Sequence, residues 1–118
     1  MAAVVPDFDV QQKWIDRVVV VSVRGDVDAL TAPRLSDEIL NALSEEPSAV
    51  IVDLSAVDFM ASSGMAVLVS TQERVTTTAR FGVVADGPGT SRPLKLMGLD
   101  AVLPIHATLD DALASCTV

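Results

Sequence analysis

The sequence has 118 residues, half of them hydrophobic and a fifth charged, so it has the composition of one folded domain, expected over residues 1–118, rather than of a disordered chain. Its formal net charge of −8, with eight scattered Lys and Arg residues, argues against binding to nucleic acid or to anionic membrane surfaces. The single cysteine, Cys116, cannot form an internal disulfide, and no leader or membrane-length apolar run is visible, so we expect a cytoplasmic protein.

The first two predicted elements are strands. Residues 17–24, "RVVVVSVR", are β-branched and almost continuously apolar, which is typical of a strand covered on both faces. Residues 8–15, "FDVQQKWI", have the pattern of a weaker, amphipathic strand. Because the link between them at Asp16-Arg17 is so short, the two strands are expected to pair as an antiparallel hairpin.

Two helices and a further strand are expected in the middle of the chain. Thr31 is a good N-cap and Pro33 fits a first helical turn. Apolar side chains then recur at helical spacing, at Ala32, Leu35, Ile39, Ala42 and Leu43. Residues 49–55, "AVIVDLS", predict a short buried strand, and a second helix is expected to run through about Ala79. Its inner face is predicted at Met65, Leu68, Val69, Gln72 and Val75.

The last third of the chain continues the alternation of strands and helices. We expect a strand at residues 80–86, a short helix that ends at Gly98, an edge-like strand around Pro104 and a last helix capped by Thr108. The order β-β-α-β-α-β-α-(β)-α predicts an α/β fold. We therefore expect a small, mostly parallel sheet with an opening antiparallel hairpin, packed with about four α-helices.

The sequence offers little for catalysis or for metal and cofactor binding. The stretch A-S-S-G at residues 61–64 is not the G-x-S-x-G elbow of a serine nucleophile, and the only histidine, His106, lies in a strand-like segment. One His and one Cys cannot build a zinc site, and no calcium-binding loop is present. The glycines of "GPGTSRP" lack a Walker lysine. We therefore expect a protein that is not an enzyme and uses no metal or cofactor.

Two adjacent serines, Ser62 and Ser63, stand between the third predicted strand and the second predicted helix. Serine is a preferred N-cap, so one hydroxyl at this junction needs no further function. Two serines followed by Gly64 are more than a cap requires, and glycine lets another group approach the backbone closely. A helix N-terminus also stabilises a phosphate through its free N–H groups and its dipole. The junction is therefore suited either to capping or to reversible phosphorylation.

Three separated stretches resemble the STAS domain family, the anti-sigma factor antagonists of bacterial partner-switching systems. "VDLSAVDFMASSGMAVLV" at residues 52–69 resembles the central signature of the family. "VRGDVDALTAP" at residues 23–33 resembles the segment that follows its second strand, and residues 92–115 resemble its ending. The resemblance implies the STAS fold. It also implies a regulatory protein that binds an anti-sigma factor with serine kinase activity, so that a sigma factor is released.

The resemblance further implies a phosphorylation switch at Ser62, the first serine of the pair. The kinase would phosphorylate Ser62 and end the complex, and a phosphatase would restore it. The partner surface implied by position in the motifs comprises Asp26, Asp28, Thr31, Ala61, Ser63, Gly64 and Met65. Ser63 would be an interface or capping residue, and we expect a monomer. Asp26 and Asp28 could equally form a solvated turn that leads into a capped helix.

Ala61 departs from the family pattern, because many relatives carry Asp immediately before the phosphorylated serine. The missing carboxylate is expected to affect recognition by the kinase more than docking of the partner. A second interpretation of the same resemblance is a STAS subunit of a stress-signalling assembly. A third is an accessory subunit of a lipid or anion transporter. The free-standing acidic domain with its Ser-Ser-Gly sequence favours the antagonist.

Overall fold

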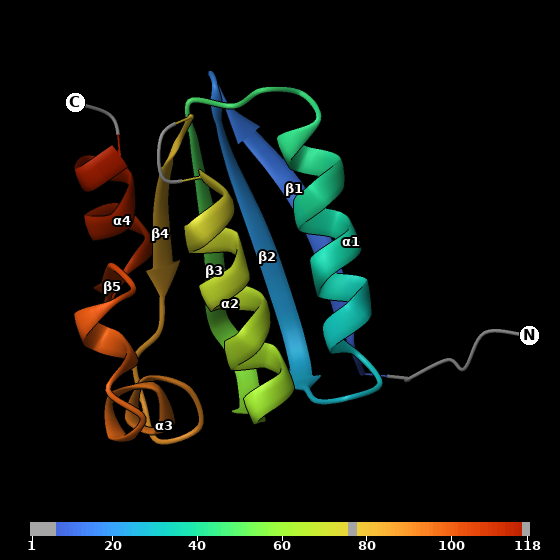
Figure 1. Cartoon of the computed structure of the whole chain (residues 1–118), viewed down its shortest axis with the longest axis vertical. Helices are drawn as coiled ribbons and strands as arrows, with labels where there is room; N and C mark the ends of the chain where they lie inside the picture. Colours follow the sequence, from blue (N-terminus) through green and yellow to red (C-terminus); the bar gives the residue numbers. More distant parts are fainter. Residues whose placement is uncertain (1–6, 76–77, 117–118) are drawn as a thin grey trace, which may run out of the picture.

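The computed structural model describes residues 7–75 and 78–116, which form one five-stranded sheet with helices packed on it (Figure 1). The strands follow one another across the sheet in chain order, and only the first pair is antiparallel. They are β1 (Asp9–Ile15), β2 (Val18–Val27), β3 (Ala49–Met60), β4 (Arg80–Val84) and β5 (Ile105–His106). The expected α/β fold with an opening hairpin is confirmed.

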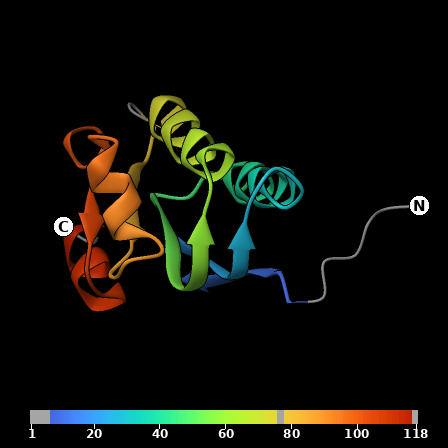
Figure 2. The same ribbon diagram turned by 90° about the horizontal axis from the view of Figure 1, so that it is seen from below.

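The helices lie on both faces of the sheet. Figure 2 shows α1 and α2 together above the sheet and α4 on the opposite side. The helices of the described chain are α1 (Ala32–Leu43), α2 (Ser62–Val75), α3 (Ser91–Leu96) and α4 (Leu109–Cys116), and a 3₁₀ turn, η1 (Leu99–Ala101), follows α3. Among the described residues, no helix has the length and apolar character needed to cross a lipid bilayer.

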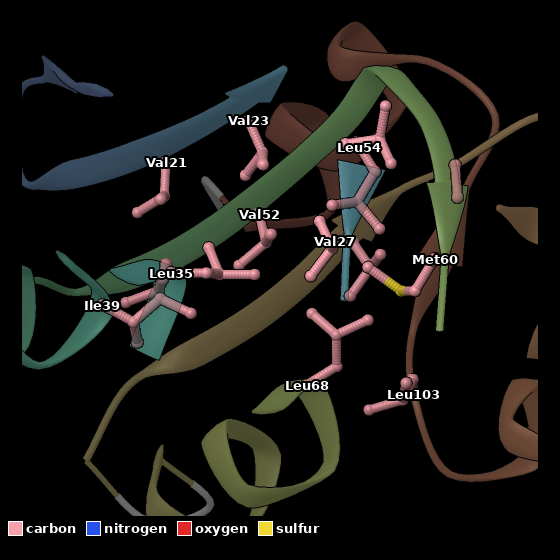
Figure 3. Close-up of a cluster of buried hydrophobic side chains, with 14 of the residues drawn as sticks. Val21, Val23, Val27, Leu35, Ile39, Val52, Leu54, Met60, Leu68 and Leu103 are labelled. Carbon is pink, nitrogen blue, oxygen red and sulfur yellow. The ribbon is translucent and has the colours of Figure 1, made fainter. Parts of the chain in front are cut away.

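Two apolar cores result from this arrangement. The larger core lies under α1 and α2, where Leu35 and Leu68 meet Val21, Val52 and other strand side chains (Figure 3). The smaller core lies under α4 and includes Ile51, Val84 and Ala112 from three different elements.

The strand β2 contributes to both cores. Val19 and Val21 point into the larger core, whereas Val18 and Val20 point into the smaller one, and each is at most 4% exposed. Its almost continuous apolar run is therefore explained by burial on both faces, as the sequence predicts.

The limits of several elements differ from the sequence-based prediction. The strand β3 continues to Met60, several residues beyond the predicted end near Ser55. The helix α2 is described as far as Val75, and Thr78 and Ala79 lie outside it, so it does not reach the predicted end at Ala79. The N–H groups of Thr78 and Ala79 both donate to the carbonyl of Val75.

Two predicted helix boundaries are confirmed by their geometry. Gly98 adopts the left-handed conformation, with φ +73°, directly after Met97, the C-cap residue of α3. The hydroxyl of Thr108 accepts a hydrogen bond of 3.1 Å from the N–H of Asp111 and so caps α4.

Candidate functional site

Three loops meet at the edge of the sheet where the parallel strands β2, β3 and β4 end, at the bottom of Figure 1. They comprise residues 26–31, which lead into α1, residues 61–65, which begin α2, and residues 86–90, which lead into α3. Parallel strands place their carboxyl ends at one edge, so segments far apart in sequence become neighbours there. All the residues expected to bind a partner lie in the first two of these loops.

The junction between β3 and α2 is held by the backbone of Ala61. Its N–H donates to the carbonyl of Val27 at 2.8 Å, which extends the pairing of β2 with β3. Its carbonyl accepts hydrogen bonds from the N–H groups of Gly64 at 3.0 Å and Met65 at 3.2 Å. The helix therefore begins at Ser62, and Ala61 occupies the capping position before it. The prediction of a serine cap is wrong, because Ala61 has only a methyl group there.

The two serines form the start of the first helical turn. Ser62 is exposed and Ser63 is half-buried, and neither side chain makes a hydrogen bond to the described part of the chain. As the first two residues of a helix, they also have N–H groups without an intrahelical acceptor. The hydroxyl of Ser62 is thus accessible beside free backbone donors and the positive end of the helix dipole.

Gly64 sets how closely α2 approaches the sheet. The residue is buried, and a Cβ added to it would lie 2.7 Å from Cγ1 of Val27 and 3.1 Å from Cγ of Met60. The groups that approach this glycine therefore belong to the end of β2 and the end of β3. Gly64 positions the two serines and does not itself present a side chain to a partner.

The loop between β2 and α1 is organised by Asp28 and Thr31. The Oδ1 atom of Asp28 accepts hydrogen bonds from the N–H groups of Leu30 at 3.0 Å and Thr31 at 3.1 Å. The hydroxyl of Thr31 donates to the carbonyl of Asp26 at 2.8 Å and accepts from the N–H of Asp28 at 2.9 Å. These bonds form the turn that one interpretation of the sequence expects.

The side chains of this loop differ in their access to solvent. Thr31 has no exposed surface, and although it occupies the N-cap position of α1, its hydroxyl makes no capping bond. Its hydroxyl is used within the loop instead, so the predicted side-chain cap is absent and Thr31 is not directly available to a partner. Asp28 is half-buried, whereas the carboxylate of Asp26 is exposed.

The third loop packs against the end of β3, just before the loop that begins α2. The carbonyl of Gly89 accepts a hydrogen bond of 3.1 Å from the N–H of Met60, the last residue of β3. A Cβ on Gly89 would collide with the backbone carbonyl of Asp58. The second glycine of "GPGT" is thus explained by backbone contact, and the loops are pinned to one another through main-chain bonds.

Large apolar side chains are exposed around this edge, and none of them belongs to the partner surface predicted from the sequence. Leu30 is 69% exposed, Phe59 is 53% exposed and Met97 is 66% exposed. They belong to the loop before α1, the end of β3 and the end of α3. Exposed apolar side chains of this size are typical of protein-binding surfaces. In the sequence, the only indication that these side chains are exposed is that they lie within the three stretches that resemble the STAS family.

The geometry gives no support to a serine nucleophile. His106 is half-buried in β5 and lies close to Gly82 and Cys116 on the α4 face of the sheet, whereas Ser62 begins α2 on the other face. Among the described residues, no side chain that could act as a base is hydrogen-bonded to Ser62. Within the described residues, no three His, Cys, Asp or Glu side chains come together as a metal site.

Cys116 is buried at the end of α4. Burial raises the pKa of its thiol, and the positive charge of Arg80 offsets part of this rise. A thiol with a raised pKa is mostly protonated at neutral pH and reacts slowly. Cys116 is therefore part of the smaller core rather than an accessible reactive group.

Comparison with known proteins gives a consistent result. The family model for the STAS domain matches residues 9–112. The anti-sigma-F factor antagonist RsfB of Mycobacterium tuberculosis is 43% identical over 96 residues, which cover 81% of this chain and 79% of that protein.

Solved structures give the same picture. The crystal structure of an anti-sigma factor antagonist from Mycobacterium paratuberculosis has a TM-score of 0.91 and 43% identity, and the match covers 97% of this chain and 98% of that one. The Bacillus cell fate determinant SpoIIAA in its phosphorylated form has a TM-score of 0.68 and 19% identity, with 91% of this chain and 98% of that one covered. This second likeness concerns the fold alone.

Proposed function

This chain belongs to the STAS domain family, and we propose that it acts as an anti-sigma factor antagonist. In this function it binds an anti-sigma factor in the cytoplasm, and the sigma factor held by that protein is released. The proposal is supported by the 43% identity to RsfB over about four-fifths of both chains. The exposed edge formed by the three loops, which carries the exposed side chains of Leu30, Phe59 and Ser62, is the surface that would dock.

The observation that carries the regulatory part of the proposal is the state of Ser62. Its hydroxyl is exposed and unbonded within the described chain, at the first position of α2. We propose that the anti-sigma factor is also a serine kinase and phosphorylates this hydroxyl. Free N–H groups of the first turn would receive the phosphate, so the modification would leave the helix and the domain folded.

The phosphate would end the complex by charge and by bulk. It adds roughly −1.5 to −2 charges and three acceptor oxygens to the docking edge. This edge already carries the exposed carboxylates of Asp26 and Asp58 in a chain of net charge −8. A loss of about 3 kcal/mol in binding would lower the affinity more than a hundredfold. A phosphatase that removes the group would restore binding.

Ala61 bears on how the kinase would recognise this site. Its backbone alone fixes the start of α2, so the geometry of Ser62 does not need a side chain at this position. A carboxylate at position 61 would compete with the phosphate for the same N–H groups of the helix. We therefore propose that Ala61 changes the rate of phosphorylation and leaves the docking of the unmodified protein intact.

The docking step is tested by pull-down with anti-sigma factor kinases of the same cell. Wild type and Ser62→Ala should bind, and Ser62→Glu should lose most of the binding. Ser115→Glu is a matched control, because Ser115 is also exposed on a helix but lies near the end of α4, on the other side of the sheet. Equal binding by Ser62→Glu and wild type would contradict the switch.

The chemical step is tested separately with the kinase and ATP. Mass spectrometry of the treated protein should place one phosphate on Ser62, and Ser62→Ala should remain unmodified. A phosphate on Ser63 alone would contradict the assignment. The structure favours Ser62, because Ser63 is half-buried.

A further inference from the structure

A groove lined mostly by apolar side chains runs along α2. One wall is the outer side of α2, and the other is the end of α3 with the start of η1. Its lining consists of Ser62, Met65, Ala66, Val69, Ser70, Glu73, Met97 and Leu99. The proposed phosphorylation site is thus one of the residues that form the groove.

The α2 wall is a second stripe on the helix, distinct from the buried one. Gly64, Leu68, Thr71 and Val75 face the core, as their burial shows. The groove residues recur from Ser62 to Glu73 at helical spacing, and Met65 and Val69 among them are only half-buried. This corrects the predicted inner face of α2 at Val69, whereas the half-buried Met65 packs against the larger core and also borders the groove. From Ser62 to Glu73 the wall is about 16 Å long at 1.5 Å per residue.

The opposite wall comes from a part of the chain with no expected site residue. Met97 is 66% exposed, and Gly98 in its left-handed conformation turns the chain so that Leu99 also faces the groove. Met97 is a flexible, polarisable side chain that adapts to different apolar partners. Its neighbour Leu96 is 76% exposed but lines a different hollow, beside Pro88 and Arg92. Two adjacent side chains of similar exposure therefore lie on different surfaces.

The charge around the groove indicates what kind of segment it accepts. Among the described residues, those that line the groove include one acidic residue, Glu73, and no Lys or Arg. The exposed Asp100 follows Leu99 directly in η1. A segment that enters the groove is therefore favoured if its apolar face is bordered by positive charge.

We propose that this groove receives an apolar segment of the anti-sigma factor that carries Lys or Arg at its border. The inference rests on the proposed function and names the part of the partner that the docking edge holds. It also places the switch, because a phosphate on Ser62 would stand at the end of the groove. The added charge would oppose burial of apolar groups there. Docking along about three helical turns would then depend on one hydroxyl.

The groove is tested with the neighbouring variants Met97→Glu and Leu96→Glu in a titration against the purified anti-sigma factor. Both place the same charge on an exposed position of the same short segment, so both should fold. Met97→Glu should weaken binding by about tenfold or more, and Leu96→Glu by less than about threefold. If wild type binds normally and the two variants weaken binding equally, the proposed docking in the groove is overturned but the proposed function is not. Failure of wild type to bind would overturn both.

A second variant fills the groove without adding charge. Ala66 is exposed on the α2 wall, and Ala66→Gln adds bulk there with little change in helix propensity. It should weaken binding, whereas Ala114→Gln, at an exposed position of α4, should not. Normal binding by Ala66→Gln would contradict the proposal.

The chemistry of the occupant is tested by crosslinking. A photoactivated crosslinker on Met97→Cys, in a chain whose Cys116 is replaced by serine, should capture a peptide of the anti-sigma factor with apolar residues beside Lys or Arg. Sedimentation equilibrium of wild type alone identifies the competing occupant. The proposal would be overturned if wild type forms a dimer that Met97→Glu dissociates and if crosslinks form only between copies of this chain. These results would show that the groove pairs two copies.

Discussion

Gly64 lies where the first turn of α2 meets the ends of β2 and β3, and its replacement by alanine is expected to destabilise the fold. The new methyl group would lie 2.7 Å from Cγ1 of Val27 and 3.1 Å from Cγ of Met60. Optimal contacts between carbon atoms are about 3.5–4.0 Å, so the shorter one is too close by roughly 1 Å. Val27 has no exposed surface and Met60 is 1% exposed, so neither can move towards solvent.

Two opposing effects determine how much Gly64→Ala destabilises the fold. Overpacking of a filled core costs roughly 1–3 kcal/mol, whereas alanine is favoured over glycine in a helix by at most about 1 kcal/mol. The clash should prevail, and Gly64→Ala should lower the free energy of unfolding by about 1–2 kcal/mol. Urea denaturation followed by circular dichroism measures this change.

Gly82 in β4 provides a matched control. A Cβ there would meet its nearest neighbours at 3.6 Å or more, which is ordinary contact. Gly82→Ala should therefore be neutral or stabilise the protein by up to about 1 kcal/mol.

A double variant tests the cause of the destabilisation. Val27→Ala alone should cost about 2 kcal/mol by leaving a cavity, and Val27→Ala with Gly64→Ala should cost less than the sum of the single changes. The reasoning is refuted if Gly64→Ala is as stable as wild type, or if the two changes simply add.

Three further predictions concern single side chains. Thr31→Val should lower the free energy of unfolding by roughly 1–3 kcal/mol, because the N–H of Asp28 and the carbonyl of Asp26 both lose the Thr31 hydroxyl as their hydrogen-bond partner. An unchanged midpoint of urea denaturation would contradict this. Asp28→Ala should reduce both stability and binding to the anti-sigma factor, whereas Asp26→Ala should reduce binding alone, as denaturation and titration of both variants would show. The pKa of the Cys116 thiol is raised in the folded state, so as pH rises the unfolded state loses this proton before the folded state does. The free energy of unfolding should therefore fall as pH rises above the ordinary thiol range. Urea titrations at increasing pH should show that Cys116→Ser removes this part of the fall.

The architecture could be predicted from the sequence because local patterns coincide with the tertiary structure. The continuous β-branched run of β2 is covered by helices on both sides, and the short link at Asp16-Arg17 permits only a hairpin. Thr108 and Gly98 act through neighbours in the chain, so their capping and turning roles are visible in sequence. Each of these features depends on contacts that the local sequence determines.

The features that were missed depend on contacts between distant segments. The N–H of Ala61 is bound to Val27 on another strand, and this bond rather than a serine cap fixes where α2 begins. The inner face of α2 is rotated towards Gly64 because that glycine lets the helix approach β2. The groove beside α2 exists only because Met97, at the end of α3, is folded back against it. No periodicity within one segment contains this information.

The order of the strands in the sheet has a consequence for how the chain acquires its structure. Each strand after β1 pairs with the strand that precedes it in the chain. When a strand joins the sheet, the only loop that has to close is therefore the segment between these two strands, a turn or a helix with its connections. Loops of this length are entropically inexpensive to close, and folding rates rise as contacts become more local. During synthesis, each newly emerged strand can join a sheet that already exists. The strand β5 and the helix α4, which contributes Ala112 and Cys116 to the smaller core, follow the other elements in the chain and so join the fold after them.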